Sequence, residues 1–355
     1  MEFINLSRYY DIKNPGIKPF EELRNMTPLK MTQDLRIFNE TDNILYAEKL
    51  AMEGLAVVPI RRQPPVEKYL GRNSFPRRIL FEMTSKCNFL CRMCPQNNLK
   101  RERMHIDKDL YKKVLDEIDD FGIEGLWTYH LGESLLHPDF KEIIEYLSLK
   151  KNLGIVWMST NGEFFTEDVS RFIVKTNIDY INYSAHAVTA ETYGTVAPKE
   201  KFDLVQNNLE MLYRIKEELK VEGKPFIHCQ MIEQETTKHE VDLFIEKHYK
   251  RADIVSVNML EYVNLPNNSF GNKQRERNPL TSCLRVSRND CFICSNGEVT
   301  LCDAAYNGEI SLGNVNEKSL YEIWNGEKRK EILELNQSGR MSQIEFCKRC
   351  TDYDI

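Results

Sequence analysis

The 355-residue chain lacks the features that mark several large classes of protein. No apolar run approaches the roughly 20 residues that cross a bilayer, so we expect no membrane association. The first ten residues, MEFINLSRYY, hold no apolar signal segment, and we therefore expect a cytoplasmic protein. The formal net charge of −6 argues against a nucleic-acid partner, because phosphate backbones are bound by clustered Lys and Arg.

Internal repeats and low-complexity segments are also missing, but cysteine is not scarce. Ten cysteines occur, and nine of them fall into two groups, at 87–94 and 283–350, with Cys229 alone between them. A reducing cytosol disfavours disulfides, so grouped cysteines there more often bind metal or do redox chemistry. The spacing therefore predicts two metal centres in two regions of the chain.

Short apolar strands alternate with amphipathic helices through the middle of the chain. The strands are predicted at 77–84, 123–132, 155–162, 178–187, 225–232 and 252–260, with helices at 107–122, 137–154, 166–177, 202–220 and 238–250. This rhythm predicts βα units around a parallel sheet. Before it, residues 41–58 have helical spacing; after about 264, a hairpin is predicted over 291–302 and a helix over 319–335.

The first cysteine group lies in SKCNFLCRMCP, residues 85–95, directly after the first predicted strand. A structural zinc site needs four protein ligands, and here three thiols share one loop with no fourth ligand beside them. Three thiolates suit a four-iron cluster that leaves one iron open to a small molecule. Zinc binding and ordinary core thiols are the alternatives.

Polar residues recur where the following strands end, which is the edge at which parallel α/β barrels bind ligands. The pair Gly132-Glu133 follows the second strand, and residues 159–162 follow the third. His186, at the end of the fourth strand, is a candidate base. Three neighbouring side chains favour core packing instead: Trp127, Tyr129 and His130.

On these motifs the sequence resembles the radical S-adenosylmethionine superfamily over residues 78–265. The resemblance implies that Cys87, Cys91 and Cys94 hold a 4Fe–4S cluster whose free iron binds the amino and carboxylate groups of S-adenosylmethionine. It implies a partial (β/α)6 TIM-like barrel over 76–265, between an N-terminal extension (1–75) and a C-terminal domain (266–355). It also implies S-adenosylmethionine contacts from Met93, Gly132, Glu133, Ser159, Asn161, Ser184 and Gln230.

The second cysteine group offers four thiols, enough for zinc or for a fully ligated cluster. Its pattern, with Asn296-Gly297 in the hairpin and a closing CKRC, resembles the short "twitch" form of the SPASM domain. The resemblance implies one auxiliary 4Fe–4S cluster in a small Cys-rich hairpin-plus-helix domain, held by Cys283, Cys302, Cys347 and Cys350. The surplus Cys291 and Cys294, like Cys229, are read as small apolar strand residues.

The resemblance implies a radical enzyme that abstracts hydrogen from a small polar substrate. We expect it to dehydrogenate a sugar- or aminocyclitol-like carbinol, with the auxiliary cluster as electron acceptor and flavodoxin or ferredoxin as electron donor. Radical modification of a ribosomally made peptide is the alternative. A redox-neutral epimerisation or dehydration of a sugar is another; epimerisation needs a hydrogen donor, for which Cys291 or Cys294 is a candidate.

Overall fold

The computed structural model describes residues 55–56, 74–221, 225–248, 251–259, 282–348 and 350, and every structural statement below concerns these residues. The predicted helix over 41–58 lies outside them except near its end, where it is wrong. There, strand β1 (Leu55–Ala56) pairs antiparallel with β7 (Ile254–Met259). Pairing with a sheet edge has overridden the local helical pattern. The predicted domain boundary at 265/266 lies outside the described residues.

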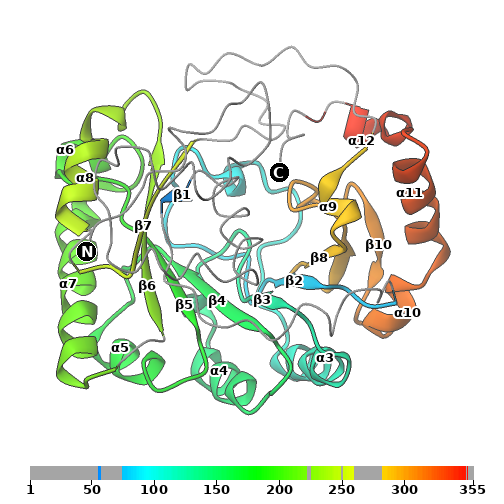
Figure 1. Cartoon of the computed structure of the whole chain (residues 1–355), viewed down its shortest axis with the longest axis horizontal. Helices are drawn as coiled ribbons and strands as arrows, with labels where there is room; N and C mark the ends of the chain where they lie inside the picture. Colours follow the sequence, from blue (N-terminus) through cyan, green and yellow to red (C-terminus); the bar gives the residue numbers. More distant parts are fainter. Residues whose placement is uncertain are drawn as a thin grey trace, which may run out of the picture.

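The predicted parallel sheet is confirmed. Its six strands run parallel in the order of the chain: β2 (Arg78–Phe81), β3 (Gly125–Trp127), β4 (Ile155–Thr160), β5 (Tyr180–Ser184), β6 (Phe226–Glu233) and β7. Each strand pairs with its sequence neighbour, as successive βα units require. Figure 1 shows these strands as an arc, which is the partial barrel expected.

The C-terminal strands continue the same sheet. β8 (Asp290–Ile293) pairs parallel with β2, and β9 (Glu298–Thr300) and β10 (Ser311–Asn314) follow in antiparallel pairs. The described strands therefore form one ten-stranded sheet with order β1-β7-β6-β5-β4-β3-β2-β8-β9-β10. The hairpin predicted over 291–302 is confirmed as β8–β9, and its first strand covers the open edge of β2.

The helices that connect the parallel strands lie along the outer side of the curved sheet (Figure 1). Helix α3 shows how the sequence sets both ends of a helix: the Asp107 side chain accepts hydrogen bonds from its first-turn amides, and Gly122 ends it at φ 74°. The helices of the barrel are α3 (Lys108–Phe121), α4 (Phe140–Ser148), α5 (Glu167–Ile173), α6 (Ala190–Tyr193), α7 (Phe202–Glu218) and α8 (Val241–His248).

The single helix predicted over 319–335 is wrong, because two helices occupy this stretch. The C-terminal helices are α9 (Leu284–Ser287), α10 (Leu320–Trp324), α11 (Glu327–Gln337) and α12 (Glu345–Lys348). A capping box between Ser319 and Glu322 starts α10, and Gly326 separates it from α11 in an extended conformation. The Asn-Gly pair at 325–326 breaks a helical pattern that is otherwise continuous.

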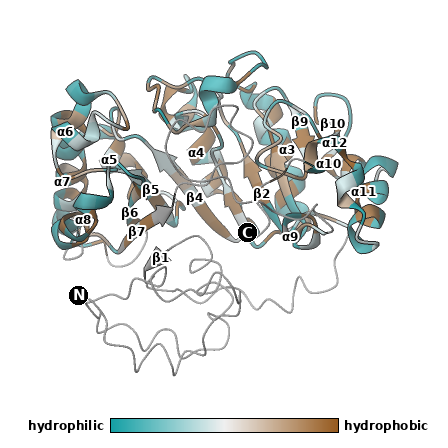
Figure 2. Cartoon of the chain, turned by 90° about the horizontal axis from the view of Figure 1, so that it is seen from above, coloured by the Kyte–Doolittle hydropathy of each residue, from teal (hydrophilic) through white to brown (hydrophobic). Residues whose placement is uncertain are grey.

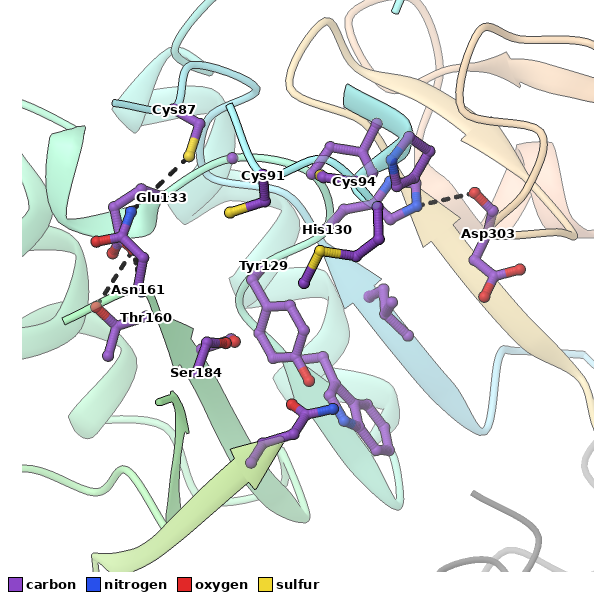
Figure 3. A pocket seen from close by; sticks show the side chains of 18 of the residues that line it. Cys87, Cys91, Cys94, Tyr129, His130, Glu133, Thr160, Asn161, Ser184 and Asp303 are labelled. Atoms are coloured by element: carbon purple, nitrogen blue, oxygen red, sulfur yellow. Dashed lines mark hydrogen bonds between the residues drawn. The ribbon is translucent and has the colours of Figure 1, made fainter. Parts of the chain in front are cut away.

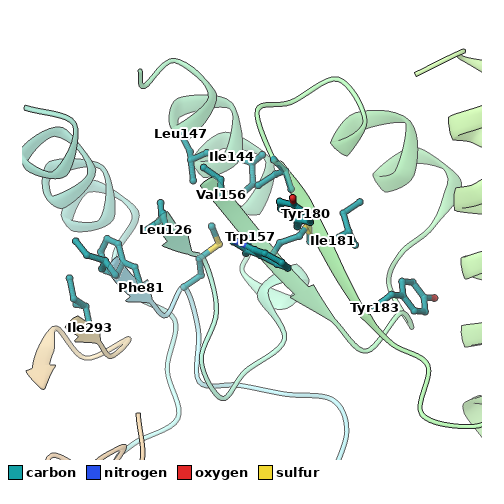
Figure 4. Packing of buried hydrophobic residues seen from close by; sticks show 14 of the residues in the cluster. Phe81, Leu126, Ile144, Leu147, Val156, Trp157, Tyr180, Ile181, Tyr183 and Ile293 are labelled. Atoms are coloured by element: carbon teal, nitrogen blue, oxygen red, sulfur yellow. The ribbon is translucent and has the colours of Figure 1, made fainter. Parts of the chain in front are cut away.

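Alternation along each strand separates an outer core from the barrel interior. On the outer side, Val156 of β4 packs toward Ile144 and Leu147 of α4 (Figure 4). On the inner side, Trp157 stacks on Tyr180 of β5 with ring centroids 4.0 Å apart. The strands are accordingly brown in Figure 2, whereas α11 on the surface is largely teal. No helix in the described ranges has the length and apolar character to cross a membrane.

Candidate functional site

A cavity of about 540 Å³ lies at the carboxyl ends of the parallel strands (Figure 3). This volume is within the range of small-molecule sites, roughly 300–1,000 Å³. All the barrel residues predicted from the sequence line it: Cys87, Cys91, Met93, Cys94, Gly132, Glu133, Ser159, Asn161, Ser184, His186 and Gln230. The structure therefore brings together side chains from the cysteine loop and from four different strand ends.

The period of two along a strand explains how distant residues reach this one cavity. Trp157 and Ser159 share the inner face of β4, and Trp157 is paired in register with Tyr180. On the neighbouring strands Ser184 is paired with Gln230. The Trp157 and Tyr180 rings are buried in the core, whereas the polar residues Ser159, Ser184 and Gln230 line the cavity.

The cysteine loop presents its three thiols to the cavity. Burial raises the pKa of Cys87 to about 11 and that of Cys91 to about 12, and it also raises the pKa of Cys94. Such thiols stay neutral unless a bound cation favours the thiolate, which an iron–sulfur cluster does. Among the described residues, no three His, Cys, Asp or Glu side chains surround a single-ion position. A cluster suits this arrangement, because each thiolate binds a different iron.

Glu133 is the most constrained side chain of the site. Its carboxylate is 2% exposed and accepts hydrogen bonds from the Asn161 amide (2.7 Å) and from the Thr160 hydroxyl (3.2 Å). The Leu135 amide donates to its other oxygen at 3.2 Å. Burial outweighs these donors and raises the pKa of Glu133 to about 7. No positively charged side chain is among the main influences on this pKa, so a cationic ligand group would stabilise the carboxylate.

The glycine before Glu133 is required by close packing. A Cβ atom at Gly132 would lie 1.9 Å from the carbonyl oxygen of Thr84, at the start of the cysteine loop. The Glu133 amide in turn donates to the Lys86 carbonyl at 3.0 Å. Segment 132–133 and the cysteine loop therefore form one rigid unit, and this fixes Glu133 relative to the thiols.

Asn161 connects the third strand end to the same loop. The side-chain Nδ2 of Asn161 donates to Asn88 Oδ1 at 2.9 Å. The same nitrogen lies 3.9 Å from Cys87 Sγ, and Figure 3 shows this contact as a dashed line. Its side-chain oxygen accepts from the Glu163 amide, which fixes the turn after β4. The predicted Asn161 is thus placed to contact both a thiolate and a ligand in the cavity.

His186 follows β5 in the left-handed region, at φ 58°, which is uncommon for a residue with a side chain. Its backbone amide donates to the Gln230 carbonyl, and its Nδ1 is buried with no hydrogen-bond partner among the described residues. Burial lowers the pKa of His186 to about 4, so the ring is neutral at pH 7. Strain of this kind is concentrated at functional sites.

A charged wall of the cavity was missed from the sequence. It consists of Arg285 and Arg288 from α9 and the turn after it, Asp290 and Phe292 from β8, and Asp303. Arg285 pairs with Asp303 at 3.1 Å, and Arg288 pairs with Asp290 at 2.8 Å. Only the pairing of β8 with β2 brings these residues to the barrel, and no local pattern indicates it.

Trp127, Tyr129 and His130 were predicted to pack in the core, and all three also line the cavity. Trp127 and Tyr129 do pack against the core, so the prediction is right for them but incomplete. β3 ends at Trp127, earlier than predicted, so the residues after it lie in the loop at the sheet edge. His130 Nε2 lies 2.9 Å from the Asp303 carbonyl oxygen and must donate to it (Figure 3). His130 thus joins the barrel to the charged wall.

A buried ion pair between Arg101 and Glu82 lies next to His130. Arg101 donates to both carboxylate oxygens of Glu82, at 2.8 and 2.6 Å, and Glu82 is fully buried. The Ser295 amide of the hairpin donates to the same carboxylate at 2.7 Å. Burial alone would raise the pKa of Glu82, but Arg101, His130 and Ser295 together lower it. Strand β2, the cysteine loop and the hairpin therefore meet at one carboxylate.

The second set of cysteines gathers at the opposite side of the charged wall. Asn336 of α11 fixes this region, because its side-chain oxygen accepts from the Cys283 amide. Burial is the main reason why the pKa values of Cys302 and Cys347 are raised. The neighbouring Cys283 raises both pKa values further, and Cys350 also raises that of Cys347. Cys283 is therefore a neighbour of Cys302 and of Cys347, and Cys347 is a neighbour of Cys350.

The surplus cysteines do not line the cavity. Cys291 and Cys294 are at most 1% exposed, and Cys291 belongs to the hydrophobic core, on the face of β8 opposite to Asp290 and Phe292. Cys229 is fully buried on the outer face of β6. Cys229 and Cys291 lie in strands, as expected, whereas Cys294 follows the end of β8 and is buried in the turn. Neither Cys291 nor Cys294 lines the cavity.

Comparison with known families gives two matches. Residues 81–226 match the model of the radical SAM superfamily, and residues 283–351 match SPASM, an iron–sulfur cluster-binding domain. The first match includes the cysteine loop and strands β3, β4 and β5 in full. The second includes all four cysteines of the second set.

Individual relatives are distant. The S-adenosyl-L-methionine-dependent 2-deoxy-scyllo-inosamine dehydrogenase of Niallia circulans is 22% identical over 77% of this chain and 92% of its own length. A tungsten-containing aldehyde ferredoxin oxidoreductase cofactor-modifying protein of Pyrococcus furiosus is 28% identical, but over only 30% of each chain. The solved structure of native anSMEcpe with bound AdoMet has a TM-score of 0.55 at 14% identity, covering 72% of this chain and 82% of that one. This last likeness supports the fold.

Proposed function

Because the chain belongs to the radical S-adenosylmethionine superfamily and carries a SPASM iron–sulfur domain, we propose that it oxidises a carbinol carbon of a small sugar- or aminocyclitol-like substrate. The observation that carries the proposal is the single cavity shared by the cysteine loop, the polar strand ends and the charged wall beside Cys302. The inosamine dehydrogenase, matched over 92% of its length, supports this substrate class.

The barrel residues would hold the first cluster and S-adenosylmethionine. In the proposal Cys87, Cys91 and Cys94 bind a 4Fe–4S cluster, and Glu133 accepts hydrogen bonds from the methionyl amino group beside Gly132. When bound and reduced, these cofactors supply a 5′-deoxyadenosyl radical, and an auxiliary cluster supplies a one-electron acceptor. The remaining contacts to the ribose, carboxylate and adenine are assigned to Ser159, Asn161, Ser184, Gln230 and Met93.

The other walls would orient the substrate and exclude water. His186, neutral because burial lowers its pKa to about 4, suits accepting a hydrogen bond from the substrate hydroxyl better than retaining a proton. Tyr129 and the charged wall offer further polar contacts to a polyhydroxylated molecule. Cys283, Cys302, Cys347 and Cys350 would hold the auxiliary 4Fe–4S cluster.

Electrons must balance in this reaction. In the proposed reaction, one electron would be consumed together with one S-adenosylmethionine, and removal of a hydrogen atom from the carbinol carbon would leave a substrate radical. That radical loses one electron and its hydroxyl proton to become a carbonyl. The products are methionine, 5′-deoxyadenosine, the oxidised substrate and a proton. We expect the first electron to come from a cytoplasmic flavodoxin or ferredoxin.

The test is turnover by the fully loaded protein under anaerobic conditions. Reconstitution should give about eight iron atoms per chain, four for each cluster. With dithionite and S-adenosylmethionine it should form 5′-deoxyadenosine, and a carbinol deuterated at carbon should transfer deuterium to that product. A panel of aminocyclitols, sugars and peptides identifies the substrate. The Cys87→Ala variant is the control and should form no 5′-deoxyadenosine.

Two results would overturn the proposal. Deuterium transfer from peptides alone would establish the peptide-modifying alternative. A sugar product at the same oxidation level as the substrate would establish a redox-neutral epimerisation or dehydration.

A further inference from the structure

Arg285 lies between the cavity and the second set of cysteines. Its side chain lines the cavity but is only 7% exposed, and its Nη2 lies 3.1 Å from Asp303 Oδ2. Asp303 directly follows Cys302, and its Oδ1 lies 3.8 Å from Cys302 Sγ. The guanidinium is thus linked to a thiol of the second set through one carboxylate.

This pair is held in place from both sides. The backbone carbonyl of Asp303 accepts the hydrogen bond from His130. The side-chain Oδ1 of Asp303 accepts a hydrogen bond from the Ala304 amide at 2.7 Å. Arg285 itself belongs to α9, whose start is fixed by the Asn336 contact to Cys283. The Asp303 carboxylate cannot move away from Cys302 without losing the Ala304 hydrogen bond, and Arg285 cannot move away without breaking its ion pair with Asp303.

A fixed charge beside a cluster changes its reduction potential. An arginine stays protonated at any ordinary pH, and burial strengthens its electrostatic effect. Reduction adds a negative charge to the cluster, so a nearby cation stabilises the reduced form and raises the potential, whereas a nearby anion lowers it. The Arg285 cation and the Asp303 anion beside Cys302 should therefore act on that potential in opposite directions.

We propose that Arg285 sets the reduction potential of the auxiliary cluster, and so determines whether that cluster can take the electron released by the substrate radical. This rests on the proposed function, which places a 4Fe–4S cluster on Cys302 and its partners. Arg285 acts through the auxiliary cluster and need not touch the reacting carbon.

Arg288 provides a matched control on the same wall. It also lines the cavity, but its Nε and Nη2 both contact Asp290 Oδ2, at 3.1 and 2.8 Å. Asp290 is shared with Arg78 of β2. The carboxylate that pairs with Arg288 therefore belongs to β8 and is not next to Cys302. The charge of Arg288 should accordingly have little influence on the potential of the auxiliary cluster.

The experiment is a redox titration of the fully loaded, full-length protein, followed by electron paramagnetic resonance. The signal that changes when S-adenosylmethionine is added belongs to the barrel cluster, and the other to the auxiliary cluster. We expect Arg285→Gln to lower the auxiliary potential by about 59 mV, a tenfold change for a one-electron couple. Arg285→Lys should restore most of it, and Arg288→Gln should leave it unchanged.

A second variant predicts the opposite sign. Asp303→Asn removes the anion nearest Cys302 and keeps its shape, so the auxiliary potential should rise. Disruption of the fold alone would not move the two potentials in opposite directions. Unchanged auxiliary potentials in both variants, with about eight iron atoms bound, would overturn the role of Arg285. A wild-type protein with about four iron atoms and one signal would instead overturn the proposed function.

Discussion

At the scale of single residues, Glu133 combines burial with fixed geometry. Its donors, from Thr160, Asn161 and Leu135, orient both carboxylate oxygens, and Gly132 allows the segment to contact the cysteine loop. The carboxylate is therefore positioned before any ligand binds. A preoriented anion of this kind binds an amino group without the cost of ordering a flexible side chain.

We predict that Glu133→Gln weakens the binding of S-adenosylmethionine by about 10- to 100-fold, since hydrogen bonds to charged groups contribute about 1.5–3 kcal/mol. Equilibrium dialysis of the loaded protein measures this. Because the pKa of Glu133 is raised to about 7, its carboxyl gains a proton below that pH. The affinity of the wild type should therefore fall as the pH drops through 7, whereas that of Glu133→Gln should not. Equal affinities in the two proteins would contradict the assignment.

At the scale of elements, Glu82 unites three segments that are far apart in sequence. Strand β2 leads directly into it, the loop after the cysteines supplies Arg101, and the hairpin supplies the Ser295 amide. The Arg101 guanidinium also donates to the Tyr306 carbonyl at 2.7 Å. These contacts hold the wall of the cavity against the barrel, so their loss should affect stability as well as the site.

We predict that Glu82→Gln destabilises the protein by about 3–5 kcal/mol, because it leaves a buried guanidinium without its partner. Thermal unfolding of the loaded protein should show a drop of several degrees. Glu142→Gln is the control: Glu142 pairs with Lys108 and Lys112 at the surface, and its loss should barely change the melting temperature.

The effect should depend on pH. The folded-state pKa of Glu82 is lowered, so its contribution is complete above the ordinary value of 4.5 and is lost as the pH falls through the lowered value. The difference between wild type and Glu82→Gln should shrink accordingly in acid. A difference that grows below pH 4.5 would contradict this account.

At the scale of the whole molecule, the sequence predicts what is local and misses what is paired over long distances. The cysteine loop and Glu133 could be predicted because each follows a strand with a clear apolar pattern. Arg285 and Asp303 could not, because they reach the cavity only through the parallel pairing of β8 with β2. The break between α10 and α11 at Gly326 was not predicted, because the residues on both sides of it have helical spacing.

We predict that a chain ending at residue 281 fails as an independent barrel. It would lack β8, which exposes the edge of the apolar strand β2, and unpaired edges promote aggregation. Size-exclusion chromatography should show aggregates. The full-length variant Cys347→Ala/Cys350→Ala keeps the strands, so it should stay monodisperse and retain about four iron atoms. A monodisperse truncated chain that still binds S-adenosylmethionine would contradict this prediction.

The pairing of β2 with β8 also has a consequence for biosynthesis. The ribosome completes β2 and the cysteine loop about 200 residues before β8, which at 5–20 residues per second is an interval of about 10–40 s. During that interval the nascent loop lacks its neighbouring strand and the charged wall beyond it. The three thiols are therefore most open to iron–sulfur assembly before synthesis ends, because β8 has not yet paired with β2.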